Sequence, residues 1–153
     1  MIKQKESFLK TEFIPLLKKL KADDKGKWGV MNAHQMAEHL IDAVKNANGK
    51  LSLPILNEGE TLEKYRAFLL SENPMREDTK NPLMPEIPAA VRSANITAAI
   101  NLLQQELDHF FEVYDQNPHL ELNNPFFGKL NYSMQIQLLH KHGMHHLKQF
   151  NLV

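Results

Sequence analysis

Two histidines near the C-terminus have a spacing that allows both to bind one metal ion. His142 and His146 are four residues apart, and residues at this spacing on a helix lie one turn apart on the same face. Two imidazoles placed in this way can each approach an ion at about 2.0–2.1 Å. His145 lies at the edge of the same arc, so it is a further candidate, either as a ligand or as a group that orients a ligand.

A third inward-facing histidine comes from an earlier segment. His39 borders an apolar stripe that includes Met36 and Leu40, so it can reach across a helical core toward His142 and His146. Without a third ligand from another helix, the pair alone would make a weak metal site. Asp42 follows His39 by just under one turn, and its carboxylate is expected to accept the N–H of the ring nitrogen that does not bind metal.

The other four histidines are expected to take no part in such a site. His34 points away from the apolar stripe of its segment and is predicted to face solvent. His140 falls on the far side of the helix that carries His142. His109 faces away from a third apolar stripe and His119 lies in a turn-rich segment, so both are predicted to lie at the surface.

Three neutral imidazoles can hold a divalent ion such as zinc, nickel, iron or manganese and leave at least one coordination position open. An open position is what a catalytic site needs, because water or a thiol bound there becomes a nucleophile. Asp42 and His145 are the candidate catalytic groups for moving protons. Two alternatives remain, a non-catalytic metal-binding or dimerising module and a helical core in which the inward histidines are only hydrogen-bonded.

The composition narrows the classes of site and partner. The chain has no cysteine, which excludes disulfides, iron–sulfur clusters and thiolate zinc sites. Basic and acidic residues number 18 each, so no net charge favours binding to nucleic acid or to anionic lipid. Apolar runs are too short to cross a membrane, and the N-terminus lacks the apolar core of a secretory signal. We expect a cytoplasmic protein without a nucleic-acid or membrane partner.

Helical periodicity predicts an all-α scaffold for these side chains. Asn32 and Asn131 are expected to cap the N-termini of two of its helices, and Gly49 to end the first of these. Pro15 is expected to bend or split the helix in which it lies. Four core helices are predicted near 5–21, 32–49, 92–115 and 131–150, with a short extra helix near 61–71.

The spacing of the helices predicts their connectivity. The chain has the length of one ordinary domain, so residues 1–153 are expected to form a single domain. Short loops join the first helix to the second and the third to the fourth, whereas about 40 residues separate the second from the third, which is typical of a four-helix bundle with one long crossover. This crossover carries the short extra helix and a proline-rich stretch at 73–88, and the turn-rich segment 117–128 is expected to be a loop.

Two stretches resemble the DinB/YfiT-like superfamily. The first is WGVMNAHQMAEHLIDA at 28–43, in which a tryptophan precedes the helix and a His-Leu pair, His39 and Leu40, lies near its middle. The second is NPFFGKLNY at 124–132 followed by LHKHGMHHLKQF at 139–150, which is similar to the closing helix of that superfamily. The resemblance implies an up-down-down-up four-helix bundle, a divalent metal ion on His39, His142 and His146, and a homodimer.

The resemblance also implies a class of activity. Known members include transferases that use a metal ion and a low-molecular-weight thiol, and related isomerases, while many members are named only as metal-dependent hydrolases. The expected partner is therefore a small-molecule substrate. The central stretch 71–88 carries no motif of the superfamily that indicates a substrate.

The aromatic residues predict a symmetric homodimer. Phe110, Phe111 and Tyr114 spread over more than one face of their helix, and Phe126 and Phe127 follow in the next turn. This is more aromatic surface than one core stripe requires, so part of it is expected to be buried between two copies. The alternative is that Phe111 or Phe127 packs under the long crossover of its own chain.

Overall fold

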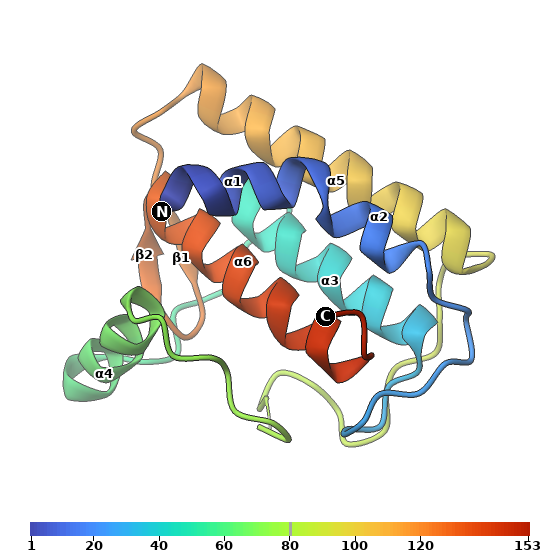
Figure 1. Cartoon of the computed structure of the whole chain (residues 1–153). Coiled ribbons are helices and arrows are strands. Elements are labelled where there is room, and N and C mark those ends of the chain that lie inside the picture. The colour runs from blue at the N-terminus through green and yellow to red at the C-terminus, as the bar shows by residue number, and fades with distance from the viewer. Residues whose placement is uncertain (80) are drawn as a thin grey trace.

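Helices make up most of the regular structure in the computed structural model of the chain, which describes residues 1–79 and 81–153. These residues form six helices and one antiparallel pair of short strands (Figure 1). In chain order the elements are α1 (Ile2–Thr11), α2 (Phe13–Leu17), α3 (Ala33–Asn48), α4 (Gly59–Leu70), α5 (Ile96–Gln116), β1 (Leu122–Asn124), β2 (Gly128–Leu130) and α6 (Tyr132–Gln149). The prediction of a mainly helical fold is therefore confirmed, whereas the small sheet was not predicted.

Pro15 splits the first predicted helix, as expected. The helix breaks at Glu12, between α1 and α2. Pro15 has no backbone N–H with which to bond the carbonyl of Thr11, and its ring crowds that carbonyl. The second piece ends at Leu17, earlier than the predicted end near residue 21.

The predicted caps of α3 and α6 are present. The Asn32 side chain accepts the backbone N–H of Gln35 at 2.8 Å, and the Gln35 side chain accepts that of Asn32 at 2.9 Å, which is a reciprocal capping box. Gly49 ends α3 with a φ of +89°, a conformation that glycine adopts without strain. The Asn131 side chain accepts the backbone N–H of Met134 and starts α6. Both helices that carry the candidate ligands thus begin where the sequence predicts.

The segment 117–128 was expected to be a loop, and this was wrong for its last part. Strands β1 and β2 pair antiparallel there, with Leu122 opposite Leu130. The Asn124 side chain accepts the backbone N–H groups of Phe126 and Phe127 and so closes the turn. Strands of three residues are too short to show an alternating pattern, so hydrophobic periodicity could not predict them.

Packing of α3 against α5 and of α1 against α6 forms the body of the molecule, and α3 also contacts α6 (Figure 1). The main core draws on α1, α2, α3, α5 and α6, and its most deeply buried side chains include Met36, Leu103, Phe110 and Leu147. A second, smaller cluster of Leu69, Phe127 and Leu130 joins α4 and the hairpin. The contact between α3 and α6 is the one that brings the predicted ligand helices together.

The aromatic surface expected at a dimer interface lies mostly inside the chain. Phe110 and Tyr114 belong to the main core, and Phe127 belongs to the smaller cluster. Phe111 is partly buried with the Lys10 ammonium 4.6 Å from its ring centre, and Phe126 stacks with Tyr65 of the crossover. Phe127 thus packs against the crossover helix α4 of its own chain, as the alternative expected. The homodimer stays a prediction.

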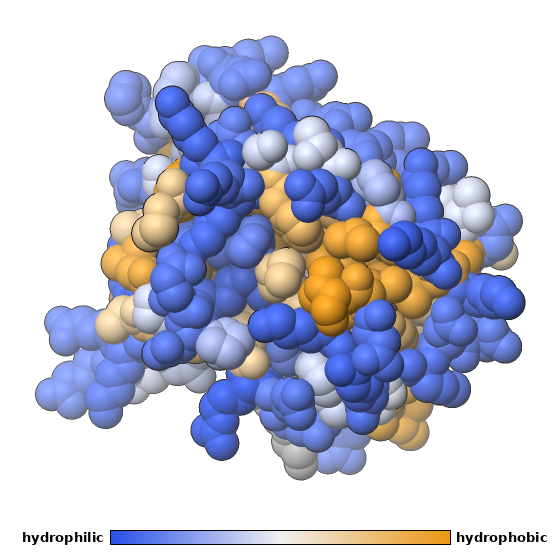
Figure 2. Space-filling model, viewed as in Figure 1, coloured by the Kyte–Doolittle hydropathy of each residue, from blue (hydrophilic) through white to orange (hydrophobic). Residues whose placement is uncertain are grey.

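Hydrophilic side chains cover most of the face shown in Figure 2, and apolar side chains gather over α2 and the C-terminal end of the chain. Leu16, Leu20 and Leu152 are partly buried there against the main core. Across residues 1–79 and 81–153, none of the helices combines the length and the apolar character needed to cross a bilayer.

Candidate metal centre

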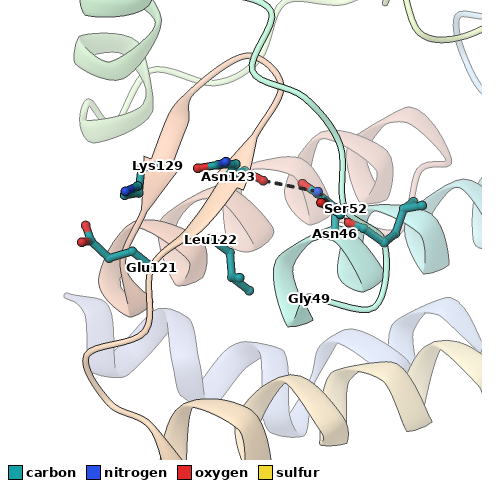
Figure 3. A pocket seen from close by; sticks show the side chains of 8 residues that line it. Asn46, Gly49, Ser52, Glu121, Leu122, Asn123 and Lys129 are labelled. Carbon is teal, nitrogen blue, oxygen red and sulfur yellow. Dashed lines mark hydrogen bonds between the residues drawn. The ribbon is translucent and has the colours of Figure 1, made fainter.

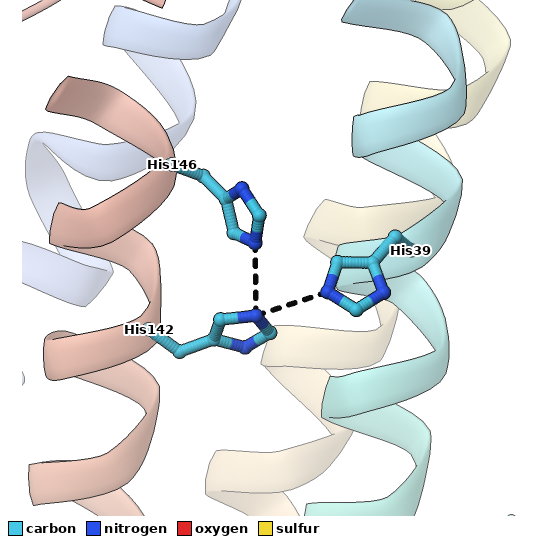
Figure 4. Close-up of side chains that lie close together, drawn as sticks. All are labelled: His39, His142 and His146. Carbon is cyan, nitrogen blue, oxygen red and sulfur yellow. Dashed lines mark hydrogen bonds between the residues drawn. The ribbon is translucent and has the colours of Figure 1, made fainter. Parts of the chain in front are cut away.

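His39 of α3 and His142 and His146 of α6 lie together, and their Nε2 atoms point toward one another (Figure 4). The His142 Nε2 atom lies 3.0 Å from His39 Nε2 and 2.9 Å from His146 Nε2. The candidate ligand atoms of all three residues lie within 4.8 Å of one another. Two nitrogens bound to one tetrahedral ion are about 3.3 Å apart, so small side-chain movements suffice for all three to share an ion.

Close approach of α2 and α6 positions the helix that carries two of these histidines. Gly143 lies directly after His142, and a Cβ atom at that position would be 3.0 Å from Cε1 of the buried Phe13 ring. The absence of a side chain therefore lets α6 pack against Phe13 at the level of the histidines. The i, i+4 spacing of His142 and His146 then directs both rings toward α3.

A chain of hydrogen bonds fixes the tautomer of His146. The Gln149 side-chain amide donates from Nε2 to the carbonyl of Trp28 at 2.9 Å, which leaves its Oε1 as an acceptor. His146 Nδ1 lies 2.7 Å from that oxygen, so Nδ1 must carry the proton. In a neutral ring the other nitrogen then has a lone pair, and it is this nitrogen, Nε2, that faces His142.

Hydrogen bonds between neutral rings cannot give all three Nε2 atoms of the cluster a partner. Because His146 Nε2 is an acceptor, His142 Nε2 must carry the proton that lies between them. A protonated ring nitrogen has no lone pair, so His142 cannot also accept a hydrogen bond from His39, and its single proton would have to be shared between two acceptors. A cation placed among three lone pairs satisfies all three nitrogens at once. This arrangement therefore fits a metal ion better than it fits a hydrogen-bonded core.

Two glycines leave room for the Gln149 side chain. A Cβ atom at Gly26 would lie 2.7 Å from Cγ of Gln149, and one at Gly29 would lie 2.9 Å from its Nε2. Gly29 also has a φ of +79°, which disfavours other residues. The backbone N–H of Lys27 donates to the Gln149 carbonyl at 2.7 Å. The loop before α3 thus holds the end of α6 through both the backbone and the side chain of Gln149.

Burial keeps all three rings in the neutral form that binds metal. Burial lowers the pKa of His39 to about 4, although the nearby Asp42 carboxylate acts in the opposite direction. Burial and the neighbouring His39 lower the pKa of His146 to about 3, against the effect of its bond to Gln149. Burial, with His146 and His39 alongside, also places the pKa of His142 well below its ordinary value. No net loss of a proton from these rings is needed at neutral pH before they coordinate an ion, and the proton of His142 has only to lie on Nδ1 for its Nε2 to bind.

The three candidate ligands differ in exposure. His146 is buried, whereas His39 and His142, taken as whole residues, keep part of their surface exposed. Three histidine ligands leave at least one position of a four-coordinate ion free. A structural metal site is normally closed, whereas a catalytic one keeps a position open.

Asp42 is close to His39 but has another partner. Its carboxylate accepts two hydrogen bonds from Nη2 of Arg92, at 3.2 and 3.3 Å. Within residues 1–79 and 81–153 no hydrogen bond joins Asp42 to His39, so the predicted bond to the second ring nitrogen of His39 is wrong. The Arg92 side chain, which arrives from the end of the crossover, competes for the carboxylate. Asp42 acts on His39 through its charge alone.

His145 lies beside the cluster and not within it. Its ring centre is 5.1 Å from that of His146 on one side and 5.4 Å from that of Trp28 on the other. Burial lowers the pKa of His145, while a hydrogen bond that its ring donates to the backbone of Met75 acts in the opposite direction. His145 also lines a cavity next to the cluster. The structure therefore does not bring it together with the three candidate ligands.

His34 was predicted to face solvent, and this was wrong. Its side chain is buried, and its Nε2 lies 2.7 Å from the Ser93 hydroxyl. That hydroxyl donates to the Glu38 carboxylate, which also accepts the backbone N–H groups of Arg92 and Ser93. The end of the crossover thus covers the face of α3 that carries His34. It also explains why α5 begins at Ile96, after the Asn95 cap, and not near residue 92.

The other histidines expected outside the site do lie elsewhere. His140 is half-buried with its ring edge-on to Phe8, at 5.3 Å between ring centres. His109 is half-buried and His119 is exposed. None of these three belongs to the metal-binding group found among the described residues.

A second cavity lies at the opposite end of α3 (Figure 3). It has a volume of about 270 Å³ and is bounded by the C-terminal end of α3, the residues after it and the hairpin. Asn46 donates to the carbonyl of Asn123 across its wall. Neither His39 nor the α6 histidines line this cavity, so it is separate from the candidate metal centre.

Comparisons of the chain with models of protein families, with curated proteins and with solved structures found no match. The likeness of 28–43 and 124–150 to the DinB/YfiT-like superfamily therefore stays a prediction. The interpretation of the site depends on the geometry of its own residues.

Proposed function

We propose that this chain binds one divalent metal ion on His39, His142 and His146 and uses it in a reaction on a small molecule. The observation that carries the proposal is the convergence of three Nε2 atoms, one of which is fixed as a lone-pair donor by Gln149. The absence of cysteine makes imidazole the natural ligand. Zinc, nickel, iron and manganese are the candidate ions.

We further propose that the chain is a DinB/YfiT-like protein. The four longer helical parts, α1 with α2, α3, α5 and α6, would form its up-down-down-up bundle, and α4 would belong to the long crossover. The pairing of α1 with α6 and of α3 with α5 is compatible with that order. The resemblance is also the sole ground for proposing a homodimer, since the aromatic side chains expected at its interface pack within the chain.

Two reaction classes share these ligands, hydrolysis and transfer to a low-molecular-weight thiol. A divalent ion in this position would lower the pKa of a bound water or thiol. The deprotonated water or thiol would then be a nucleophile near neutral pH. The three-histidine ligand set would leave at least one position of the ion free for the substrate. We propose Asp42 and His145 as the groups that move protons, Asp42 from beside His39 and His145 from beside His146.

The alternative is a metal-binding module without catalysis. It shares all three ligands and differs in having no chemistry at the open position. The number of protein ligands favours a reaction, because structural zinc sites usually have four protein ligands, whereas catalytic sites have three and an open fourth position.

Activity with and without metal tests the proposal. Tag-free protein would be screened for ester hydrolysis and for thiol transfer, before and after treatment with a chelator and after return of one equivalent of metal. We expect an activity that is lost with the metal and restored by it, that His142→Ala lacks and that the exposed control His119→Ala retains. If the protein binds one equivalent of metal but is no more active than His142→Ala, the proposal of an enzyme is wrong and the non-catalytic metal-binding module is favoured.

A further inference from the structure

A cavity of about 370 Å³ lies beside the candidate metal centre. Its walls come from α6, from Lys5 of α1, from Trp28 and from the segment that follows α4. This volume lies within the range of small-molecule sites. None of the three candidate metal ligands lines it, and His145 separates it from His146.

Cationic groups outnumber anionic groups in this cavity. Lys5, Lys141 and Lys148 line it, against Glu72 and Glu77. Lys5 Nζ donates to both carboxylate oxygens of Glu72, at 2.8 and 2.9 Å, so these two charges are already paired. Within the part of the chain that the structure describes, no carboxylate lies within 4.0 Å of the ammonium of Lys141 or Lys148. With Lys5 and Glu72 paired, two ammonium groups remain against the carboxylate of Glu77, so the cavity has a surplus of one positive charge.

Lys141 is the strongest sign of a ligand. Its side chain is only 7% exposed, and its ammonium donates to the carbonyls of Ser71 and Asn73 and lies 4.5 Å from the centre of the Phe68 ring. Carbonyl oxygens accept two of its three N–H groups, and neither of these partners nor the Phe68 ring carries a charge. A buried ammonium gains most from an anionic partner, because burial removes the water that would otherwise solvate the charge.

Another part of the cavity wall suits a flat apolar group. Trp28 and Met144 contribute to the lining, and the ring of His145 packs against the indole. Aromatic surfaces of this kind favour stacking of another ring. We infer that this cavity binds a small organic anion, with its charged group on Lys141 and Lys148 and its flat apolar part against Trp28. Binding at this cavity does not require a metal ion, so the inference does not depend on the proposed function.

Trp28 is the only tryptophan of the chain, so its fluorescence reports directly on this cavity. Chelator-treated protein would be titrated with benzoate and with benzyl alcohol, which has a similar size and no charge. We expect a saturable change in emission with benzoate and a much weaker response to benzyl alcohol. Loss of one charge-assisted hydrogen bond in Lys141→Met should weaken benzoate binding by about tenfold or more.

Two further variants keep the test decisive. Lys148→Gln changes an exposed side chain and should fold even if Lys141→Met does not, and it should also weaken benzoate binding, whereas the distant exposed Lys129→Gln should have no effect. His142→Ala should bind benzoate as the unchanged chain does. Equal responses to benzoate and benzyl alcohol, or equal affinities of Lys148→Gln and Lys129→Gln, would overturn the inference. A response to benzoate that appears only after metal is returned would also overturn the inference, because benzoate would then be bound to the metal ion and not to the lysines.

Discussion

His146 donates its Nδ1 proton to Gln149 over 2.7 Å, and this bond determines that Nε2 of the same ring carries the lone pair that faces His142. Gln149 is itself oriented by the carbonyl of Trp28. The orientation of a candidate ligand in the last helix therefore depends on the loop that precedes α3. Outer hydrogen bonds of this kind commonly set the tautomer and the direction of a metal-binding imidazole.

Replacing Gln149 by leucine should weaken metal binding. The variant removes the acceptor of His146 Nδ1, and loss of such a partner typically costs about 10- to 100-fold in metal affinity. Lys148→Leu is the matched control, because Lys148 is adjacent in sequence and exposed. A competition titration against a metal-binding dye measures both. If Gln149→Leu binds metal as tightly as Lys148→Leu, the hydrogen bond does not orient the ligand.

The loop glycines provide a second test of the same relationship. Gly29→Ala places a Cβ atom 2.9 Å from Gln149 Nε2 and imposes an unfavourable φ of +79°. Gly59→Ala also imposes a positive φ, of +59°, but its Cβ atom meets nothing within 4 Å. Both should lose about 1–2 kcal/mol of unfolding free energy through backbone strain. In the competition titration Gly29→Ala alone should also lose metal affinity, and equal affinities would show that Gln149 tolerates displacement.

Local patterns in the sequence predicted the features of the site that depend on one helix. The caps at Asn32 and Asn131 and the spacing of His142 and His146 all concern residues within a turn or two of one another. The third candidate ligand, His39, was predicted from its place beside an apolar stripe. These predictions hold because helix geometry alone decides which face each side chain occupies.

Features that depend on distant segments were missed. His34 was predicted to be exposed because the pattern of α3 gives no sign that the segment with Ser93 packs over it. Ser93 contacts His34 and is bonded to Glu38. The role of Gln149 depends on the Trp28 carbonyl, 121 residues away in sequence. A glutamine one turn after a candidate ligand is a weak signal, although two glycines beside a lone tryptophan could have drawn attention to a close contact.

Stability should depend on pH through Glu106. Burial acts to raise the pKa of Glu106, but hydrogen bonds from Asn48 at 2.9 Å and from Lys50 at 3.0 Å outweigh it, so the pKa is lowered on folding. A carboxylate with a lowered pKa stabilises the fold above its unfolded pKa, and this stabilisation is lost as the pH falls through the folded pKa.

Replacing this carboxylate by an amide tests that sign. Glu106→Gln should lower the free energy of unfolding at pH 7 by about 1–3 kcal/mol, through loss of the charged hydrogen bonds. At a pH below the folded pKa the difference from the unchanged chain should shrink, because the carboxyl is then neutral in both states. Urea unfolding at both pH values measures this, with the exposed Glu112→Gln as control. A difference that grows on acidification would contradict the assignment.

Metal content tests the central claim most directly. Protein prepared without a histidine tag would be analysed by mass spectrometry for divalent metals, alongside His142→Ala and the exposed control His119→Ala. Three converging imidazoles predict about one ion per chain in the unchanged protein and in His119→Ala, and almost none in His142→Ala. Equal metal content in the unchanged chain and in His142→Ala would contradict the account.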